Sequence, residues 1–357
     1  MQQRLLEILA CPECRDALRL EAAERQGEEI LSGVLRCAGC AGAFPVRGGI
    51  PRFVTGDTYV STFSFEWKRW QRTQLDTAGR HTSRLTFTHS TGKQPEDLAG
   101  RLVLDAGCGT GRYMDVAARA GAEIVGVDLS FAIEVARQNL AAFPRCHFVQ
   151  ADLNRLPFRP ECFDFVYSIG VLHHTPDTRT AFLSLVKTVQ PGGGIAIWVY
   201  PRYRLADAFR YFPGDTDSIL RQDYHFTIPP RFVPILRWSA GALDRGIETS
   251  SDAQRFFTTR LPARWLYEMC HVAIPLYYLY RIPLFYPLRL LSKISMDPNP
   301  EWRVLETFDW YSPRYQWKHS FHEVLGWFEE AGLREITPLP RLVAVSGVRP
   351  RAESNTS

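Results

Sequence analysis

Short apolar runs alternate with amphipathic segments from Arg101 onward. In the amphipathic segments apolar residues recur every three or four positions, as on one face of a helix. The apolar runs predict strands over 102–106, 123–128, 146–151, 162–168 and 195–200. The amphipathic segments predict helices over 112–120, 130–142 and 179–189. A PGGG segment at 191–194 predicts a turn before the fifth strand. Strands that alternate with helices form βαβ units, so the pattern predicts an α/β domain with a doubly wound, mostly parallel sheet.

Residues 201–300 interrupt this rhythm. Prolines and aromatic residues are dense there and strand patterns are weak, so we expect a helical insertion that caps the open end of the sheet. The rhythm returns at 320–331, where Ser320 and Glu323 are spaced as a capping box at the start of a helix. A last strand is predicted at 341–348.

These changes of pattern divide the chain into six parts. They are a cysteine-rich domain at 1–55, a helical lid or linker at 56–100, the alternating core at 101–200, the helical cap at 201–300, the C-terminal part of the core fold at 301–349 and a disordered tail at 350–357.

Composition narrows the possibilities only slightly. Hydrophobic residues make up 45% of the 357 positions, and 42 basic side chains face 38 acidic ones. A net charge of +4 is too small to indicate nucleic-acid binding by itself. The chain does not open with the apolar segment of a signal peptide, so we expect a cytoplasmic protein. The stretch 272–291 is interrupted by prolines and arginines, which predicts peripheral membrane contact at most and no transmembrane segment.

Four of the eight cysteines form two CxxC pairs, Cys11 with Cys14 and Cys37 with Cys40. Each pair bends the backbone so that two thiolates face one point, and four sulfurs complete the tetrahedral shell of Zn²⁺. In a protein without an export signal this pattern favours a metal over disulfides or free thiols. Because four protein ligands leave no open coordination position, we predict a structural zinc ribbon.

A glycine-rich loop, GCGTG at 107–111, joins the first strand of the core to the following helix. A nucleotide-like ligand binds at this place in a doubly wound sheet. The dinucleotide fingerprint G-x-G-x-x-G is not matched, because Arg112 occupies its third glycine position. Asp128 and Asp152 end the next two strands, where carboxylates can reach ribose hydroxyls and an adenine amino group. The alternative is that these residues only cap helices and turns.

With these motifs in order, the chain resembles class I S-adenosylmethionine (SAM)-dependent methyltransferases. It is similar to their type 11-like group, and especially to the branch that contains ubiquinone- and menaquinone-biosynthesis enzymes. The segments that carry the resemblance are LDAGCGTGR, VGVDLS, ADLNRLPF, FDFVYSIGVLHHTPD and PGGGIAIWVY. The resemblance is dense over 101–200 and thin elsewhere. It implies a Rossmann-like methyltransferase sheet with SAM as cofactor.

The resemblance also implies which residues hold SAM. The matching positions are Asp105, Gly107, Cys108, Gly109 and Gly111 for the amino-acid part, Asp128, Leu129, Asp152 and Leu153 for the nucleoside, and Ile169 and Gly170 beside the methyl group. Gln74 and Asp76, which precede the sheet, are predicted to close over SAM.

The N-terminal segment, from LLEILACPECRDAL to FPVRGGIPRF, resembles the small zinc-ribbon activators of tRNA and protein methyltransferases. In that family the ribbon is often a separate subunit that stabilises its partner, whereas here it is fused to the rest of the chain. The resemblance implies either the same stabilising role or contact with a substrate, and the sequence leaves both open.

Methyl transfer from a sulfonium needs alignment and desolvation, and it needs a general base only when the acceptor is a hydroxyl or a carbon acid. His173 and His174 follow the fourth strand beside the expected methyl group and could accept a proton. The favoured alternative is that they cap the adjacent helix or pack against the insertion. Asp309, Tyr311 and His319 lie in an aromatic block that would either roof the substrate or belong to the core.

Three functions remain open. The leading prediction is an enzyme that methylates a small-molecule or lipid-like acceptor, because the cap is rich in Tyr, Phe, Leu and Pro. The second is an rRNA or tRNA methyltransferase whose zinc ribbon recognises the substrate; the chain lacks the Lys/Arg-dense strip that such a partner favours. The third is a non-catalytic SAM-binding scaffold, which the intact glycine loop disfavours.

A membrane surface would be contacted by Tyr277, Tyr278 and Tyr280 with Arg281, Arg289 and Lys293.

Overall fold

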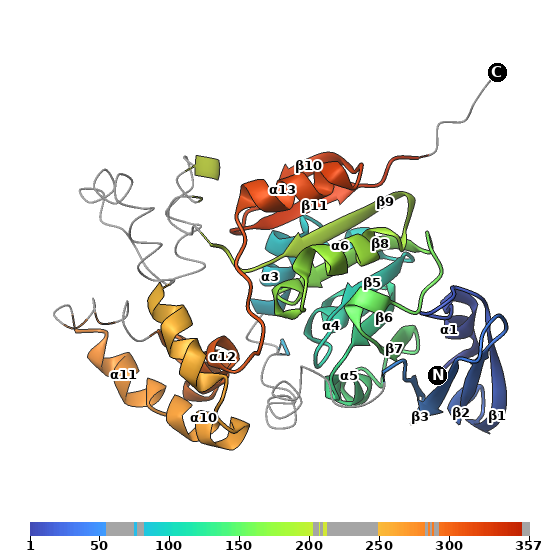
Figure 1. The fold of residues 1–357 in the computed structure, drawn as a ribbon, viewed down its shortest axis with the longest axis horizontal. Helices are drawn as coiled ribbons and strands as arrows, with labels where there is room; N and C mark the ends of the chain where they lie inside the picture. The colour runs from blue at the N-terminus through green and yellow to red at the C-terminus, as the bar shows by residue number, and fades with distance from the viewer. Residues whose placement is uncertain are drawn as a thin grey trace.

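Two sheets organise the chain (Figure 1). The computed structural model describes residues 1–54, 75–76, 82–202, 207, 210–212, 249–282, 285, 288 and 293–351. Gln74, Arg289, about half of the predicted lid and of the predicted cap, and the tail from 352 lie outside these residues.

The N-terminal sheet has four strands in the order β1-β2-β3-β4, all antiparallel. Its elements are α1 (Gln3–Ile8), β1 (Leu18–Gln26), β2 (Glu29–Cys37), β3 (Ala43–Arg47) and β4 (Ile50–Pro51).

The second sheet has seven strands in the order β10-β11-β9-β8-β5-β6-β7. The strands are β5 (Leu102–Ala106), β6 (Glu123–Asp128), β7 (Cys146–Gln150), β8 (Phe163–Ile169), β9 (Val189–Trp198), β10 (Arg334–Pro338) and β11 (Ala344–Val348). From β9 to β7 all neighbours are parallel, and only β11 runs antiparallel to β9 and β10. The predicted doubly wound, mostly parallel fold is therefore confirmed.

Helices flank this sheet and extend beyond its strand ends. They are α3 (Thr82–Thr91), α4 (Arg112–Arg119), α5 (Ala132–Asn139), α6 (Thr178–Val186), α10 (Ala263–Cys270), α11 (Ala273–Leu279), α12 (Pro300–Tyr311) and α13 (Phe321–Glu330). Three short 3-10 turns are η1 (Pro95–Leu98), η2 (Leu153–Arg155) and η3 (Leu172–His174). Figure 1 shows α10, α11 and α12 beyond one end of the sheet and the ribbon at the opposite side of the molecule.

The chain reverses its direction of travel across the sheet between β5 and β8. From β5 it proceeds outward through β6 to β7, and it then returns to place β8 on the other side of β5. In doubly wound sheets the loops that follow two such strands, here β5 and β8, border the crevice in which ligands bind. The glycine-rich loop follows β5 directly, so it lies at this switch point.

Three local predictions were wrong. The PGGG segment does not form a turn but lies inside β9, where Phe163 pairs with Val189 and Phe165 with Gly194, so the extra residues form a bulge. The last strand begins at Ala344 rather than 341. Strand β10 was missed because it is an edge strand with mostly exposed residues, and it lacks the apolar run that marks buried strands.

Two helices pack against segments that lie across the predicted domain boundaries. Helix α3, within the predicted lid, packs on the sheet, and the ring of Phe87 meets that of Tyr167 edge to face at 5.2 Å. Helix α12, assigned to the C-terminal part of the core, shares a hydrophobic cluster with α10 through residues such as Leu305 and Leu266. The pattern of apolar and polar residues could not predict either packing contact, because both contacts join segments that are distant in the sequence.

Backbone pairing joins the ribbon to the methyltransferase core at two points, one of them on a strand of the large sheet. Arg52 forms a parallel bridge with Gln150 at the free edge of β7, and Leu9 forms an antiparallel bridge with Phe158. Leu9 and Phe158 are fully buried in one hydrophobic cluster that contains residues of both domains. The ribbon and the core therefore share a continuous apolar interior.

Ion pairs surround this junction. Arg52 bonds the Glu134 carboxylate at 2.7 Å, and Arg137 bonds Glu29 at 2.6 Å. Pairs of this kind at a protein surface contribute little individually, so apolar burial and backbone pairing hold the ribbon in place. No helix in the described part of the chain is long and apolar enough to cross a membrane.

Leu9→Ala tests whether the two domains unfold together. Because the lost side chain is fully buried in the shared cluster, we expect the free energy of unfolding to fall by about 2–5 kcal/mol, in a single transition. Denaturant unfolding followed by circular dichroism measures this. The control Leu85→Ala removes a leucine of α3 that is 58% exposed and should change stability by less than about 0.5 kcal/mol. Separate melting of the ribbon, with the large sheet unaffected, would contradict a shared interior.

Candidate active site and metal centre

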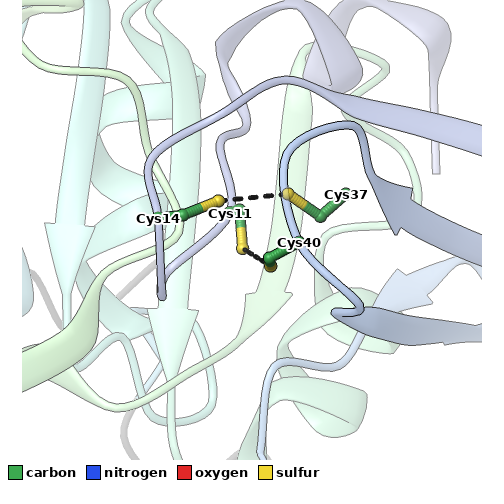
Figure 2. Close-up of side chains that lie close together, drawn as sticks. All are labelled: Cys11, Cys14, Cys37 and Cys40. Carbon is green, nitrogen blue, oxygen red and sulfur yellow. Dashed lines mark hydrogen bonds between the residues drawn. The ribbon is translucent and has the colours of Figure 1, made fainter.

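The four cysteines of the two CxxC pairs meet at one point (Figure 2). All four sulfur atoms lie within 4.8 Å of one another. The Sγ atoms of Cys11 and Cys40 are 3.7 Å apart, and those of Cys14 and Cys37 are 3.2 Å apart. A zinc ion with four sulfurs at about 2.3 Å requires sulfur separations of about 3.8 Å. The donor set and its spacing thus fit a tetrahedral zinc site.

The ribbon backbone supports these thiolates. The N–H of Gly39 points to the sulfur of Cys37 at 3.3 Å, and the N–H of Gly42 points to that of Cys40 at 3.4 Å. Donors of this kind stabilise negative charge on sulfur, as a metal-bound thiolate requires. With four protein sulfurs around it, zinc here would hold the turns of the ribbon together and leave no position for a reacting molecule.

Three glycines give the loop after β5 its path. Gly107, Gly109 and Gly111 all have positive φ angles, of 86°, 51° and 86°, a region that other residues rarely adopt. A Cβ atom at Gly107 would lie only 2.3 Å from Val171 on the other side of the switch point. Gly111 begins α4, whose N-terminus therefore opens at the crevice. The loop lets the backbone approach a ligand closely.

Asp128 ties this loop to the end of β6. Its Oδ2 accepts the Gly109 N–H at 2.9 Å, and its Oδ1 accepts the N–H and hydroxyl of Ser130 at 2.8 and 2.6 Å. A carboxylate offers about four acceptor positions, so these three bonds leave capacity for a ribose hydroxyl. Burial raises the pKa of Asp128, while the Ser130 and Gly109 donors oppose this rise. The neighbouring Leu129 is buried and accepts a bond from Gln150 through its carbonyl.

Asp105 lies beneath the loop rather than at its surface. Its side chain is buried and accepts the Tyr167 hydroxyl at 3.0 Å. Burial raises the pKa of Asp105 to about 8, so the group is mostly protonated at neutral pH. Cys108 is also buried, and burial raises the pKa of its thiol well above the usual value. The side chains of both residues therefore support the loop from below.

Sequence analysis missed Gly126, which makes room for this support. A Cβ atom at Gly126 would lie 2.3 Å from the sulfur of Met114 and 2.9 Å from that of Cys108. Only glycine lets α4 and the loop pack this closely on β6. An isolated glycine inside a strand is the signal that could have identified it.

The remaining predicted SAM residues line the other strand ends. Asp152 Oδ1 accepts bonds from the backbone and side chain of Asn154 at 2.8 and 2.9 Å, so it caps η2, and Leu153 is buried just after it. Ile169 is buried at the end of β8. Gly170 has a φ of 77°, and a Cβ there would lie 2.9 Å from the Trp198 ring.

Asp76 caps a helix. Its carboxylate accepts the N–H groups of Ser83 and Arg84 at 2.8 and 3.0 Å, in the first turn of α3. The Ser83 hydroxyl in turn accepts a bond from Arg112, whose guanidinium faces the ring of Trp302 on α12. Asp76 thus supports the mouth of the crevice through α3, and the prediction that it closes over SAM remains a prediction.

The two histidines after β8 are buried and neutral. The backbone N–H of Tyr200 donates to His173 Nδ1 at 3.3 Å, so the proton of the neutral ring lies on Nε2. Within the part of the chain that the structure describes, this buried Nε2 has no hydrogen-bond partner. His174 Nδ1 faces the carbonyl of Tyr315 at 2.8 Å and must donate to it, which leaves its Nε2 as an acceptor. Burial lowers the pKa of His174 to about 4 and holds the pKa of His173 well below its usual value.

Tyr200 joins these histidines to Asp309. Its ring stacks on His173 with 3.8 Å between centroids, and its hydroxyl lies 3.3 Å from Asp309 Oδ2. Burial raises the pKa of Asp309 to about 6; Glu306 adds to this rise, and Tyr200 and Arg255 oppose it. Sequence analysis missed Tyr200, although its place at the end of the predicted fifth strand of a doubly wound sheet was a usable signal.

The other two predicted catalytic residues are engaged elsewhere. Both ring nitrogens of His319 have partners, Glu323 at 2.8 Å and Thr178 at 3.0 Å. The Tyr311 hydroxyl lies 2.8 Å from both the Gln254 side chain and the Lys293 carbonyl, inside the cap cluster. The prediction that His319 and Tyr311 take part in catalysis therefore stays a prediction. The structure brings together His173, His174 and Asp309, and not these two.

Asp128→Ala should weaken SAM binding more than tenfold in calorimetry. The variant removes a ribose partner and also releases Gly109, so the loop loses its tie to β6. The matched control is Asp164→Ala, because Asp164 accepts the Leu102 N–H at the opposite end of β5. Unchanged affinity in Asp128→Ala, or an equal loss in the control, would rule out this placement of the nucleoside.

Comparison with known protein families matches residues 104–197 to the methyltransferase domain family and residues 2–49 to the Trm112p-like protein family. Demethylmenaquinone methyltransferase of Clavibacter sepedonicus is 37% identical over 101 residues, which cover 28% of this chain and 41% of that protein. The tRNA U34 carboxymethyltransferase of Azotobacter vinelandii is 40% identical over 106 residues, which cover 28% of this chain and 33% of that protein. The chain spans less than half the length of either relative.

Among solved structures, a complex between the Haloferax volcanii Trm112 methyltransferase activator and a putative methyltransferase matches at 18% identity and a TM-score of 0.33. The match covers 42% of this chain and 65% of that one. The match over 2–49 covers most of the N-terminal sheet and contains the cysteine cluster, and the match over 104–197 covers the parallel part of the large sheet. Residues 104–197 thus belong to a methyltransferase domain of the SAM-dependent class, fused in one chain to a Trm112p-like zinc-ribbon domain.

Proposed function

We propose that this chain transfers the methyl group of SAM to an oxygen atom of a small-molecule or lipid-like acceptor. The observation that carries the proposal is the bond between Gly109 and Asp128, which fixes a glycine loop and a carboxylate side by side at the switch point. SAM bound there would supply an electrophilic methyl group. The residues of the chain would hold the nucleoside through Asp128 and Asp152 and admit the amino-acid part over Gly107.

The acceptor would lie at the ends of β8 and β9. Gly170 follows Ile169 in the segment expected beside the methyl group, and it packs against Trp198 at the end of β9. Trp198, Tyr200 and His173 then form a contiguous group of rings. Apolar rings exclude water from the path of methyl transfer, which favours an in-line displacement.

Asp309 is the best candidate for a general base. A hydroxyl acceptor must lose its proton as its oxygen forms the new bond to carbon. Neither histidine suits this role, because the free Nε2 of His173 already carries a proton and the pKa of His174 is about 4. The pKa of Asp309, about 6, lies close to neutral pH, where a base combines availability with strength. His173 Nε2–H would instead donate to an acceptor oxygen.

The ribbon would stabilise the methyltransferase domain from within the chain. Its pairing with β7 and its share in the common apolar cluster support this role. The cap helices, not the ribbon, lie beyond the other end of the sheet (Figure 1). We therefore assign the ribbon stability rather than contact with the acceptor.

Transfer RNA is the second candidate acceptor. The Trm112p-like match and the likeness to a tRNA carboxymethyltransferase favour it. The apolar character of the cap and the small net charge of +4 argue against an RNA acceptor.

Incubation of the purified protein with methyl-labelled SAM and fractionated cell extract identifies the acceptor. We expect label in the lipid or small-molecule fraction, because the rings around Trp198 suit an apolar acceptor. Label in RNA that is lost on nuclease treatment would establish the second candidate instead. The Asp128→Ala protein is the control for contaminating enzymes. An absence of label in every fraction, with SAM binding intact, would indicate a scaffold and overturn the proposal.

Asp309→Asn should lower kcat by about 100-fold or more with the acceptor so identified. In the unaltered protein we expect the rate to rise with pH through about 6 and then level, because the base acts only when deprotonated and its activity is lost as pH falls below its pKa. The variant should lose this step in the pH–rate profile. Tyr200→Phe keeps the ring but removes the bond to Asp309, so its step should shift to higher pH. A normal rate and profile in Asp309→Asn would eliminate Asp309 as the base.

A further inference from the structure

Exposed apolar side chains gather on the cap. Among the described residues, large hydrophobic side chains with 48–69% exposure recur between 256 and 282, whereas those elsewhere are scattered along the sequence. The members of this set are Phe256, Phe257, Trp265, Met269, Val272, Tyr278 and Ile282. Monomeric proteins rarely expose such a concentration of apolar surface without a partner.

On helix α10 the exposed apolar side chains lie on one face. Trp265, Met269 and the following Val272 are spaced by four and three positions, so they lie on one face. The opposite face carries Leu266 and Cys270, which are buried against α12. Packing of the inner face is therefore complete, and the outer face of large apolar groups remains unpartnered within the described chain. Figure 1 shows α10 and α11 on the outside of the molecule, away from the sheet.

Positive charge accompanies this face. Arg260, Arg264 and Arg281 are exposed, against one exposed carboxylate, Glu268, on α10. Asp252 nearby is paired with Lys318 at 2.9 Å. The Arg260 guanidinium lies over the Phe256 ring, 3.8 Å from its centroid, so its stem covers apolar surface while its charge faces solvent. The balance of charge complements an anionic surface.

The aromatic residues indicate what kind of surface this is. Trp and Tyr with flanking Arg are enriched where proteins meet the headgroup region of a bilayer, since these side chains have an apolar body and a polar or charged end. The structure exposes only part of the set of tyrosines that the sequence predicted to make this contact. Tyr280 is buried, and Tyr277 lies under the Arg303 guanidinium at 3.7 Å. Only Tyr278 of the three predicted tyrosines is exposed.

We propose that the outer face of α10, made by Trp265 and Met269 with the following Val272, docks on an anionic lipid bilayer, with Arg260 and Arg264 at the headgroups. The inner side of α10 packs on α12, the helix that carries Asp309. Docking would therefore bring the membrane close to the acceptor end of the crevice. That consequence rests on the proposed lipid-like acceptor; the docking itself does not.

Sedimentation with lipid vesicles tests this. The full-length protein should pellet with vesicles of phosphatidylcholine mixed with phosphatidylglycerol, bind phosphatidylcholine alone several-fold more weakly, and dissociate as salt is raised. The double variant Trp265→Ser/Met269→Ser should bind the mixed vesicles at least about tenfold more weakly, because two large side chains no longer enter the bilayer. Leu85→Ser, on α3, is the matched control and should bind normally.

An arginine double variant and calorimetry with SAM distinguish the possible causes of a change in vesicle binding. Arg260→Ala/Arg264→Ala leaves the apolar face intact and should lose only the preference for anionic vesicles. Calorimetry with SAM on the same proteins should show unchanged affinity, which separates failure of docking from failure of the proposed function. Failure of the unaltered protein to bind mixed vesicles would overturn the proposal. So would gel filtration showing a dimer that the Trp265→Ser/Met269→Ser protein cannot form, because a second copy would then cover the face.

Discussion

The bond from the Gly109 N–H to the Asp128 carboxylate joins the loop after β5 to the end of β6, and the crevice depends on it. Parallel strands deliver their carboxyl ends to one edge, but they do not fix the loops that follow. Asp128 does so by accepting from Gly109 and from Ser130 at once. The same residue that would hold the ribose thus shapes the loop that would hold the rest of SAM, which couples ligand binding to loop order.

The ribbon lies at the β7 edge of the large sheet. β7 would otherwise present a free edge, and the pairing of Arg52 with Gln150 covers part of it. Burial of Leu9 against Phe158 makes the two domains one hydrophobic unit. A zinc ion that holds four sulfurs together would therefore stabilise the methyltransferase domain without approaching its crevice. Fusion in one chain keeps this support present at every protein concentration.

Contacts across long sequence distances gather several polar groups at the ends of β8 and β9. Asp309 from α12 lies 3.3 Å from the Tyr200 hydroxyl, and the Tyr200 ring stacks on His173. This group therefore combines a carboxylate of raised pKa, that of Asp309, with a buried N–H donor, that of His173. On the proposed function, an acceptor with an oxygen next to an apolar body would match this combination.

Local sequence patterns were sufficient to predict the strand and helix order of the core, the glycine loop and the four-cysteine set. These depend on local periodicity, on the positive φ of Gly107 and on the short spacing within each CxxC pair, all of which neighbouring residues fix. The pairing of polar groups follows from the tertiary structure instead. Tyr200 bonds Asp309 across 109 positions, while both ring nitrogens of His319 bond Glu323 and Thr178. A residue's type predicts what it can bond, but its partner depends on how distant segments of the chain pack together.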